Sequence, residues 1–152
     1  MLKVVLAGVL GYVVGAERQL IAHREAGSRT FSLVAMSSAL VTALSLDAFG
    51  TDSAARIIAN IMVGVGFLGG GMILKDPGHI RGLTTAAGMW AIAAVGMAVG
   101  SGRFGLGVLA GLLILLVFSA ERADSAVRRL LGRPQADQVD EDRSGRGPED
   151  RS

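Results

Sequence analysis

Charged and hydroxyl side chains gather in four short stretches of an otherwise apolar chain. The candidates for a functional polar cluster are Glu17, Arg18, Arg29, Thr30, Asp76, Arg81, Thr84 and Thr85. A carboxylate at the end of an apolar segment is unfavourable unless it is paired, solvated or functional. We expect Glu17 to pair with Arg29, and Asp76 with Arg81. The two threonine hydroxyls, at the start of an apolar segment, can cap a helix or bind an anion there.

Several other kinds of chemistry are excluded by what the chain lacks. It has no cysteine, which excludes disulfides, thiolate metal sites and cysteine nucleophiles. No spacing in the sequence indicates a Ser-His-Asp triad or a pair of catalytic carboxylates. We therefore expect no enzyme and no resident metal. Residues 64–69 match G-x-G-x-x-G, but the strand before it and the acid about 20 residues after it are missing. We therefore expect no nucleotide or other cofactor.

The segments between the polar stretches are long and apolar. Hydrophobic residues make up 51% of the chain and its mean hydropathy is +0.50. A transmembrane helix needs about 20 such residues, and about 17 at least. Strand-like alternation is absent, so the sequence predicts an all-α membrane protein with about five spans. They are Leu2–Ala16, Phe31–Leu46 with a possible extension to Phe49, Ile57–Leu74, Leu83–Gly100 and Phe104–Ala120.

The distribution of basic residues predicts the orientation of these spans. In chain order the four connections carry 3, 1, 2 and 1 lysines or arginines, and the tail carries 7. Because cytoplasmic segments are enriched in these residues, we expect the N-terminus outside and the C-terminus inside. An alternative, in which Leu2–Ala16 is a cleaved signal peptide, would send Arg18 and Arg29 outward against this rule. With the N-terminus outside, as this rule predicts, all four polar stretches meet at the cytoplasmic mouth of the bundle.

The composition changes sharply near residue 120, which divides the chain into two predicted parts. Residues 1–120 form the transmembrane domain, and residues 121–152 form a charged cytoplasmic tail. Glu121–Leu131 is expected to continue the last span as an amphipathic helix. Gly132–Ser152 holds too little apolar surface to fold, so it is expected to be disordered. The basic residues lack interleaved aromatics, and we expect no nucleic-acid partner.

Glycines repeat at helical spacing in four of the five predicted spans. The G-x-x-x-G pairs expected to mediate helix packing include Gly11 with Gly15 and Gly66 with Gly70. Such pairs remove side chains from one helix face, which lets a neighbouring helix approach closely. We favour packing within the chain over a dimer face. Asn60 is the one strongly polar side chain of its span, and its amide is expected to bridge two helices by a hydrogen bond.

The chain resembles the MgtC/SapB family of small bacterial inner-membrane proteins. The resemblance extends from about Gly8 to about Leu116. The stretches that carry the resemblance are Gly15-Ala16-Glu17-Arg18-Gln19, residues 26–30 with Leu33-Val34, residues 64–69 with Gly71, Ile73 and Leu74, and residues 81–87 with Trp90, Ala93 and Ala94. The resemblance implies a multi-pass inner-membrane protein associated with adaptation to low magnesium. This chain departs from the pattern at Gly69-Gly70-Gly71, where the family usually has Gly-Ala-Gly. It also has a charged tail where some members have a folded C-terminal domain.

Two functions are consistent with these residues. The first is a non-enzymatic membrane regulator that acts through helix–helix contacts and the cytoplasmic polar cluster. Its partners would be the lipid bilayer and another integral membrane protein, or further copies of itself as a homo-oligomer. The second is a magnesium transporter or channel, since Mg²⁺ keeps several waters and usually takes one or two carboxylates. In that case Glu17 and Asp76 would line the path.

Overall fold

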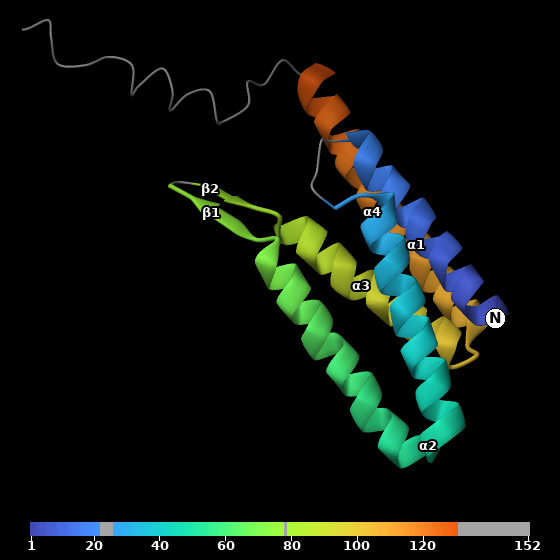
Figure 1. The fold of residues 1–152 in the computed structure, drawn as a ribbon. Helices are drawn as coiled ribbons and strands as arrows, with labels where there is room; N and C mark the ends of the chain where they lie inside the picture. The colour runs from blue at the N-terminus through green and yellow to red at the C-terminus, as the bar shows by residue number, and fades with distance from the viewer. Residues whose placement is uncertain (22–25, 78, 131–152) are drawn as a thin grey trace, which may run out of the picture. The chain divides into compact units, whose positions relative to one another are not determined.

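The computed structural model describes residues 1–21, 26–77 and 79–130, without the side chains of residues 20–21, 76 and 121–130. Its elements are α1 (Leu2–Ile21), α2 (Ser28–Gly71), β1 (Leu74–Asp76), β2 (His79–Arg81), α3 (Leu83–Gly100) and α4 (Phe104–Leu130), as shown in Figure 1. The chain divides into two compact units, Met1–Ser119 and Ala120–Ser152. The first unit holds the functional candidates. The predicted disordered tail, Gly132–Ser152, lies outside the described residues.

Helix α2 is broken at one glycine rather than interrupted by a loop. It is assigned over 44 residues, but Gly50 has φ 68° and ψ 174°, which is not helical. Glycine adopts this conformation readily because it has no Cβ. The break divides α2 into a first limb, residues 28–49, and a second limb, residues 51–71, which diverge from the bend in Figure 1. The second and third predicted spans are therefore these two limbs, and the connection predicted between them is helical.

The helix ends differ from the prediction in α1 and α2. Helix α1 continues past Ala16 to Ile21, so Glu17 and Arg18 lie within it. Helix α2 ends at Gly71, before the predicted limit at Leu74. Helix α4 runs without interruption from Phe104 to Leu130, so the last predicted span continues past Ala120 as the same helix. The bounds of α3 are those predicted.

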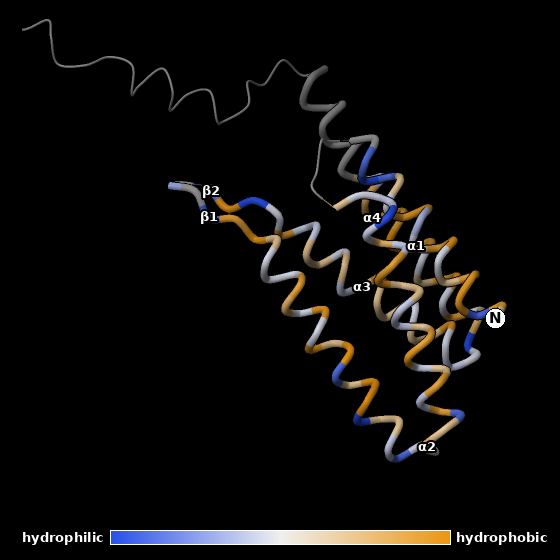
Figure 2. Tube along the Cα trace, in the orientation of Figure 1, coloured by the Kyte–Doolittle hydropathy of each residue, from blue (hydrophilic) through white to orange (hydrophobic). Residues whose placement is uncertain are grey.

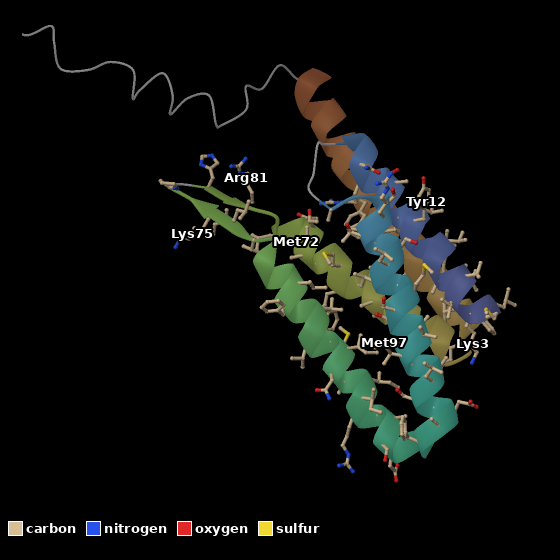
Figure 3. The ribbon with its side chains drawn as sticks, viewed as in Figure 1. Lys3, Tyr12, Met72, Lys75, Arg81 and Met97 are labelled. Atoms are coloured by element: carbon tan, nitrogen blue, oxygen red, sulfur yellow. The ribbon has the colours of Figure 1, made fainter. Side chains whose placement is uncertain are left out.

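A β-hairpin connects α2 to α3. Strands β1 and β2 pair antiparallel, with Leu74 opposite Arg81, Lys75 opposite Ile80 and Asp76 opposite His79. Each strand has 3 residues, too few for alternation to reveal it in the sequence. Lys75 and Arg81 point to opposite sides of this hairpin in Figure 3. The fold remains helical apart from this connection.

Small residues allow α1, the first limb of α2 and α3 to pack closely. A Cβ added at Gly11 would lie 2.6 Å from the carbonyl oxygen of Phe31, and one added at Gly15 would lie 2.6 Å from the Cα of Ser28. The buried core includes Phe31, Ala35, Ala39, Ile92 and Val95. Because the contact is made by glycine and alanine, helix backbones meet with few side chains between them.

Two of the described helices have the length and hydropathy that a membrane span requires. Helices α2 and α3 are long and apolar enough to cross a bilayer, and Phe104–Ala120 is a shorter apolar helix. Figure 2 shows apolar residues along the helices, with polar residues gathered at the bend of α2 and around the hairpin. The number of five spans and their orientation remain predictions.

We predict that Gly11→Ala destabilises the bundle and that Gly66→Ala does not, although both glycines belong to G-x-x-x-G pairs. The Gly11 methyl would meet Phe31 and Ala35, whereas a Cβ at Gly66 has nothing within 4 Å. Overpacking of this kind lowers the free energy of unfolding by about 1–3 kcal/mol. The midpoint of thermal unfolding in detergent would measure it. Equal midpoints for the two variants would show that the Gly11 contact is not tight.

Candidate functional site

A buried arginine lies at the centre of the polar cluster. Arg18 of α1 is 1% exposed. Its Nη2 donates a hydrogen bond to the Thr85 hydroxyl of α3 at 2.8 Å. Its guanidinium carbon lies 4.4 Å from the centre of the Phe118 ring of α4, a cation–π contact. One side chain therefore joins three helices that are far apart in the sequence.

The ring beneath Arg18 is positioned by its own neighbours. Phe118 meets Phe31 edge to face, with ring centres 6.5 Å apart and planes at 76°. A Cβ at Gly88 would lie 2.6 Å from the Cζ of Phe118, so a larger residue there would require the ring to shift. The cation–π contact thus depends on a glycine of α3 and an aromatic residue of α2.

The start of α3 explains why Thr85 is available to Arg18. The N-cap residue is Gly82, in the left-handed conformation with φ 88°, and the cap has no side-chain hydrogen bond. The predicted capping role of Thr84 and Thr85 is therefore not seen. Thr85 is 3% exposed and accepts the bond from Arg18 instead, while Thr84 is half-buried.

Two further polar contacts hold the same end of the bundle. The hydroxyl of Ser28, at the start of α2, donates to Oε1 of Gln19 at 3.0 Å. The hydroxyl of Ser119 in α4 donates to Oε1 of Glu17 at 3.3 Å. These contacts connect α1 to α2 and to α4 by hydroxyl groups.

The expected pair of Glu17 with Arg29 is not formed. Arg29 is exposed, and no ion pair or hydrogen bond joins it to any residue in the described part of the chain. Arg29 is in the first turn of α2, and Gly27 and Ser28 fill the close approach to α1 instead. The physical reason is that backbone proximity at Gly15 and Gly27 favours short side chains over a guanidinium.

The remaining members of the predicted cluster lie elsewhere. Thr30 lines a groove between the two limbs of α2. Arg81 is exposed on β2, and its proposed pairing with Asp76 stays a prediction because the Asp76 side chain lies outside the described part of the structure. The structure therefore brings together Glu17, Arg18 and Thr85.

Four residues of the site were missing from the predicted set: Gln19, Ser28, Phe118 and Ser119. Gln19 and Ser28 stand next to predicted residues in the polar stretches, so their neighbours could have indicated them. Phe118 and Ser119 end an apolar run, and nothing in the sequence marks them as part of a functional site. Only the packing of α4 on α1 and α3 reveals them.

Of the residues predicted to mediate helix packing, some make close contacts and others do not. Gly11 and Gly15 meet α2 closely, while Gly66 and Gly70 have nothing within 4 Å of an added Cβ. Asn60 was predicted to bridge helices, but its side chain is exposed and makes no hydrogen bond to the residues that the structure describes. The structure does not form that bridge within one chain.

A further polar contact lies at the opposite end of the bundle. The Nζ of Lys3 donates to the carbonyl oxygen of Gly100, the last residue of α3, at 3.0 Å. A cation there interacts favourably with the helix dipole. Among the described residues no group of three or more His, Cys, Asp or Glu side chains could hold a metal ion.

Comparison with known proteins places the chain in a family. The sequence model of the MgtC family matches residues 4–124. The chain is 42% identical over 125 residues to YhiD of Escherichia coli K12, which is named as a proposed magnesium transporter; the match covers 76% of this chain and 57% of YhiD. No solved structure matches.

Two proteins named MgtC give similar matches. MgtC of Brucella abortus strain 2308 is 43% identical over 114 residues, covering 74% of this chain and 48% of that protein. MgtC of Salmonella typhimurium is 43% identical over 114 residues, covering 75% of this chain and 48% of its own length. The chain spans about half the length of the curated relatives it matches. With a family match over most of its length and apolar helices, the chain belongs to the MgtC family and is a membrane protein.

Proposed function

We propose that the protein is a non-enzymatic regulator in the bacterial inner membrane, active in adaptation to low magnesium. The observation that carries this proposal is the position of Arg18. Its guanidinium is buried against Phe118 and bonded to Thr85, so it fastens α1, α3 and α4 together. A fixed positive charge within the polar cluster opposes the passage of a divalent cation. The arrangement is suited to holding a surface in one shape rather than to conducting ions.

The link to magnesium comes from the family. The chain resembles MgtC proteins, and one relative carries a name that proposes magnesium transport. We place the protein in the inner membrane with multiple spans, on the basis of its apolar helices and the alternation of basic residues.

Magnesium transport is the second candidate, and Glu17 favours it. The carboxylate is half-buried at the end of the apolar part of α1, and one of its oxygens accepts a bond from the exposed Ser119. Hydrated Mg²⁺ is commonly held by one or two carboxylates. Glu17, with Asp76 from the hairpin, would then be the residues that contact the ion.

Mg²⁺ flux into proteoliposomes tests the two functions. We expect no saturable flux from folded protein above that of protein-free vesicles, because Arg18 is fixed within the cluster. Glu17→Gln serves as the matched variant, since it keeps the size of the side chain and an oxygen acceptor for Ser119. Saturable flux that Glu17→Gln abolishes would establish transport and contradict the regulator.

Growth of a bacterial host that lacks its own MgtC-family protein, in low-magnesium medium, supplies the second readout. For a regulator, Glu17→Gln should support growth like the unchanged protein, because Arg18 still joins the helices. For a transporter, Glu17→Gln should lose growth and flux together.

A further inference from the structure

The second limb of α2 has one packed face and one bare face. Ile58, Ile61, Val65 and Gly69 lie on the packed face, and all are buried or half-buried. A Cβ added at Gly69 would be 3.5 Å from the Cβ of Ala86 in α3, which is ordinary contact. The opposite side of the limb is exposed, and a Cβ added there at Gly64 or Gly71 would meet nothing within 4 Å.

The bare face has the spacing of a helix-pairing seam. Asn60, Gly64, Phe67 and Gly71 follow one another at intervals of 4, 3 and 4 residues, and all four are exposed. Phe67 is 83% exposed, and a Cβ at Gly64 or Gly71 would have nothing within 4 Å. Alternating steps of 3 and 4 keep a row of residues along one side of a helix, as in a left-handed helix pair. We call these four residues the Asn60 seam.

Asn60 adds one polar side chain to this otherwise apolar seam. The residue lies within the apolar run of residues 57–68, one turn after Arg56. Its amide makes no hydrogen bond to any described residue. An amide without a partner is unfavourable in hydrocarbon, and in membranes such side chains bond across helices. Lipid chains offer no donor or acceptor, so a second protein helix fits better than lipid.

We propose that the second limb of α2 pairs with the same limb of a second copy of this chain, as a parallel symmetric dimer. Copies inserted in the same direction bring each residue opposite itself at the same depth. A symmetric contact must be self-complementary, and the amide both donates and accepts, so Asn60 can bond Asn60 of the second copy. A single Asn in such a seam is also known to select the register and number of helices.

The groove between the two limbs of α2 provides the space that the Phe67 ring of the second copy needs. It has a volume of about 570 Å³ and is lined on the second limb by Gly64, Phe67 and Leu68. Thr30, Val34 and Ser37 line it on the first limb. Phe67 of the second copy packs over the bare backbone at Gly64 and reaches this apolar space. The interface is independent of the proposed function, because a regulator and a transporter would pair in the same way.

Single-cysteine crosslinking in native membranes tests the dimer directly, because the chain has no cysteine of its own. Under mild oxidation, Gly64→Cys, Phe67→Cys and Gly71→Cys should form disulfide-linked bands of twice the chain mass. Gly66→Cys is the matched control, since it is equally open but points away from the seam. Met62→Cys, on the packed side, is the second control. Equal crosslinking at Gly66, bands of other masses, or no dimer band would overturn the proposal.

The role of Asn60 has its own test, Asn60→Leu combined with Phe67→Cys. An interhelical hydrogen bond of this kind in a membrane is worth about 1–2 kcal/mol, which is roughly a tenfold change in dimer association. We expect the crosslinked fraction at low expression to fall accordingly, while the thermal midpoint of the monomer in detergent is unchanged because Asn60 is exposed. Unchanged crosslinking would show that the amide does not hold the two copies together.

Discussion

Arg18→Gln should destabilise the bundle strongly, because three helices lose the side chain that joins them. Glutamine is too short to keep both the bond to Thr85 and the contact with Phe118. A hydrogen bond from a charged donor contributes about 1.5–3 kcal/mol, and a desolvated cation–π contact about 2 kcal/mol. Part of this gain offsets the desolvation of the guanidinium. We therefore expect a loss of about 2–4 kcal/mol in the free energy of unfolding. Thermal unfolding in detergent, followed by size-exclusion chromatography, measures it.

Two comparison variants separate charge from packing at this position. Arg29→Gln removes the same charge from an exposed side chain, and should change stability by less than about 0.5 kcal/mol. Arg18→Met is uncharged and its side chain is as long as that of glutamine, but its thioether can contact the Phe118 ring through sulfur. If Arg18→Met is as stable as the unchanged protein while Arg18→Gln is not, packing rather than charge dominates. If Arg18→Gln behaves like Arg29→Gln, Arg18 does not fasten the helices.

Gly82→Ala should be the most damaging change in the connection between the hairpin and α3. Gly82 has φ 88°, and a Cβ built there would overlap the carbonyl oxygen of Met72. The left-handed conformation costs an alanine about 1–2 kcal/mol, and relief of the overlap requires the backbone to move. We expect a total loss of about 3 kcal/mol or more in the free energy of unfolding. The same thermal measurement applies.

Gly102→Ala is the matched control for this change. Gly102 has φ 85°, nearly the same conformation, but only the Lys3 Nζ comes within 4 Å of an added Cβ, at 3.9 Å. It should therefore show the conformational cost alone, about 1–2 kcal/mol. If the two variants lose equal stability, the approach of Met72 to Gly82 contributes nothing, and only backbone strain matters.

Both predictions concern residues on which the candidate site depends. Gly82 begins α3, and Thr85 is in the first turn of that helix. A shift of the α3 start would move the Thr85 hydroxyl away from Arg18 even though no residue of the polar contact has changed. If the regulator proposal is correct, both Gly82→Ala and Arg18→Gln should consequently lower growth in low magnesium.

The amino-acid sequence by itself determined the helical class and the family. Apolar segments of bilayer length must be helical, because hydrocarbon leaves backbone groups no other partners. Residues 83–100 illustrate this, since the span predicted from the apolar run and helix α3 have the same bounds. The motifs around Glu17, Gly64 and Arg81 carried the resemblance to the MgtC/SapB family, and the family match covers them.

The tertiary structure alone decided which side chains meet. Gly11 and Gly66 belong to identical sequence patterns, yet one is in tight contact and the other faces open space. Arg18 found Thr85 and Phe118, whereas Arg29, from the neighbouring stretch, remained exposed. Sequence spacing shows which residues share a helix face, but not how helices rotate or cross. Those angles result from close contacts distributed over the whole bundle, and long side chains can reach several neighbours before packing selects one.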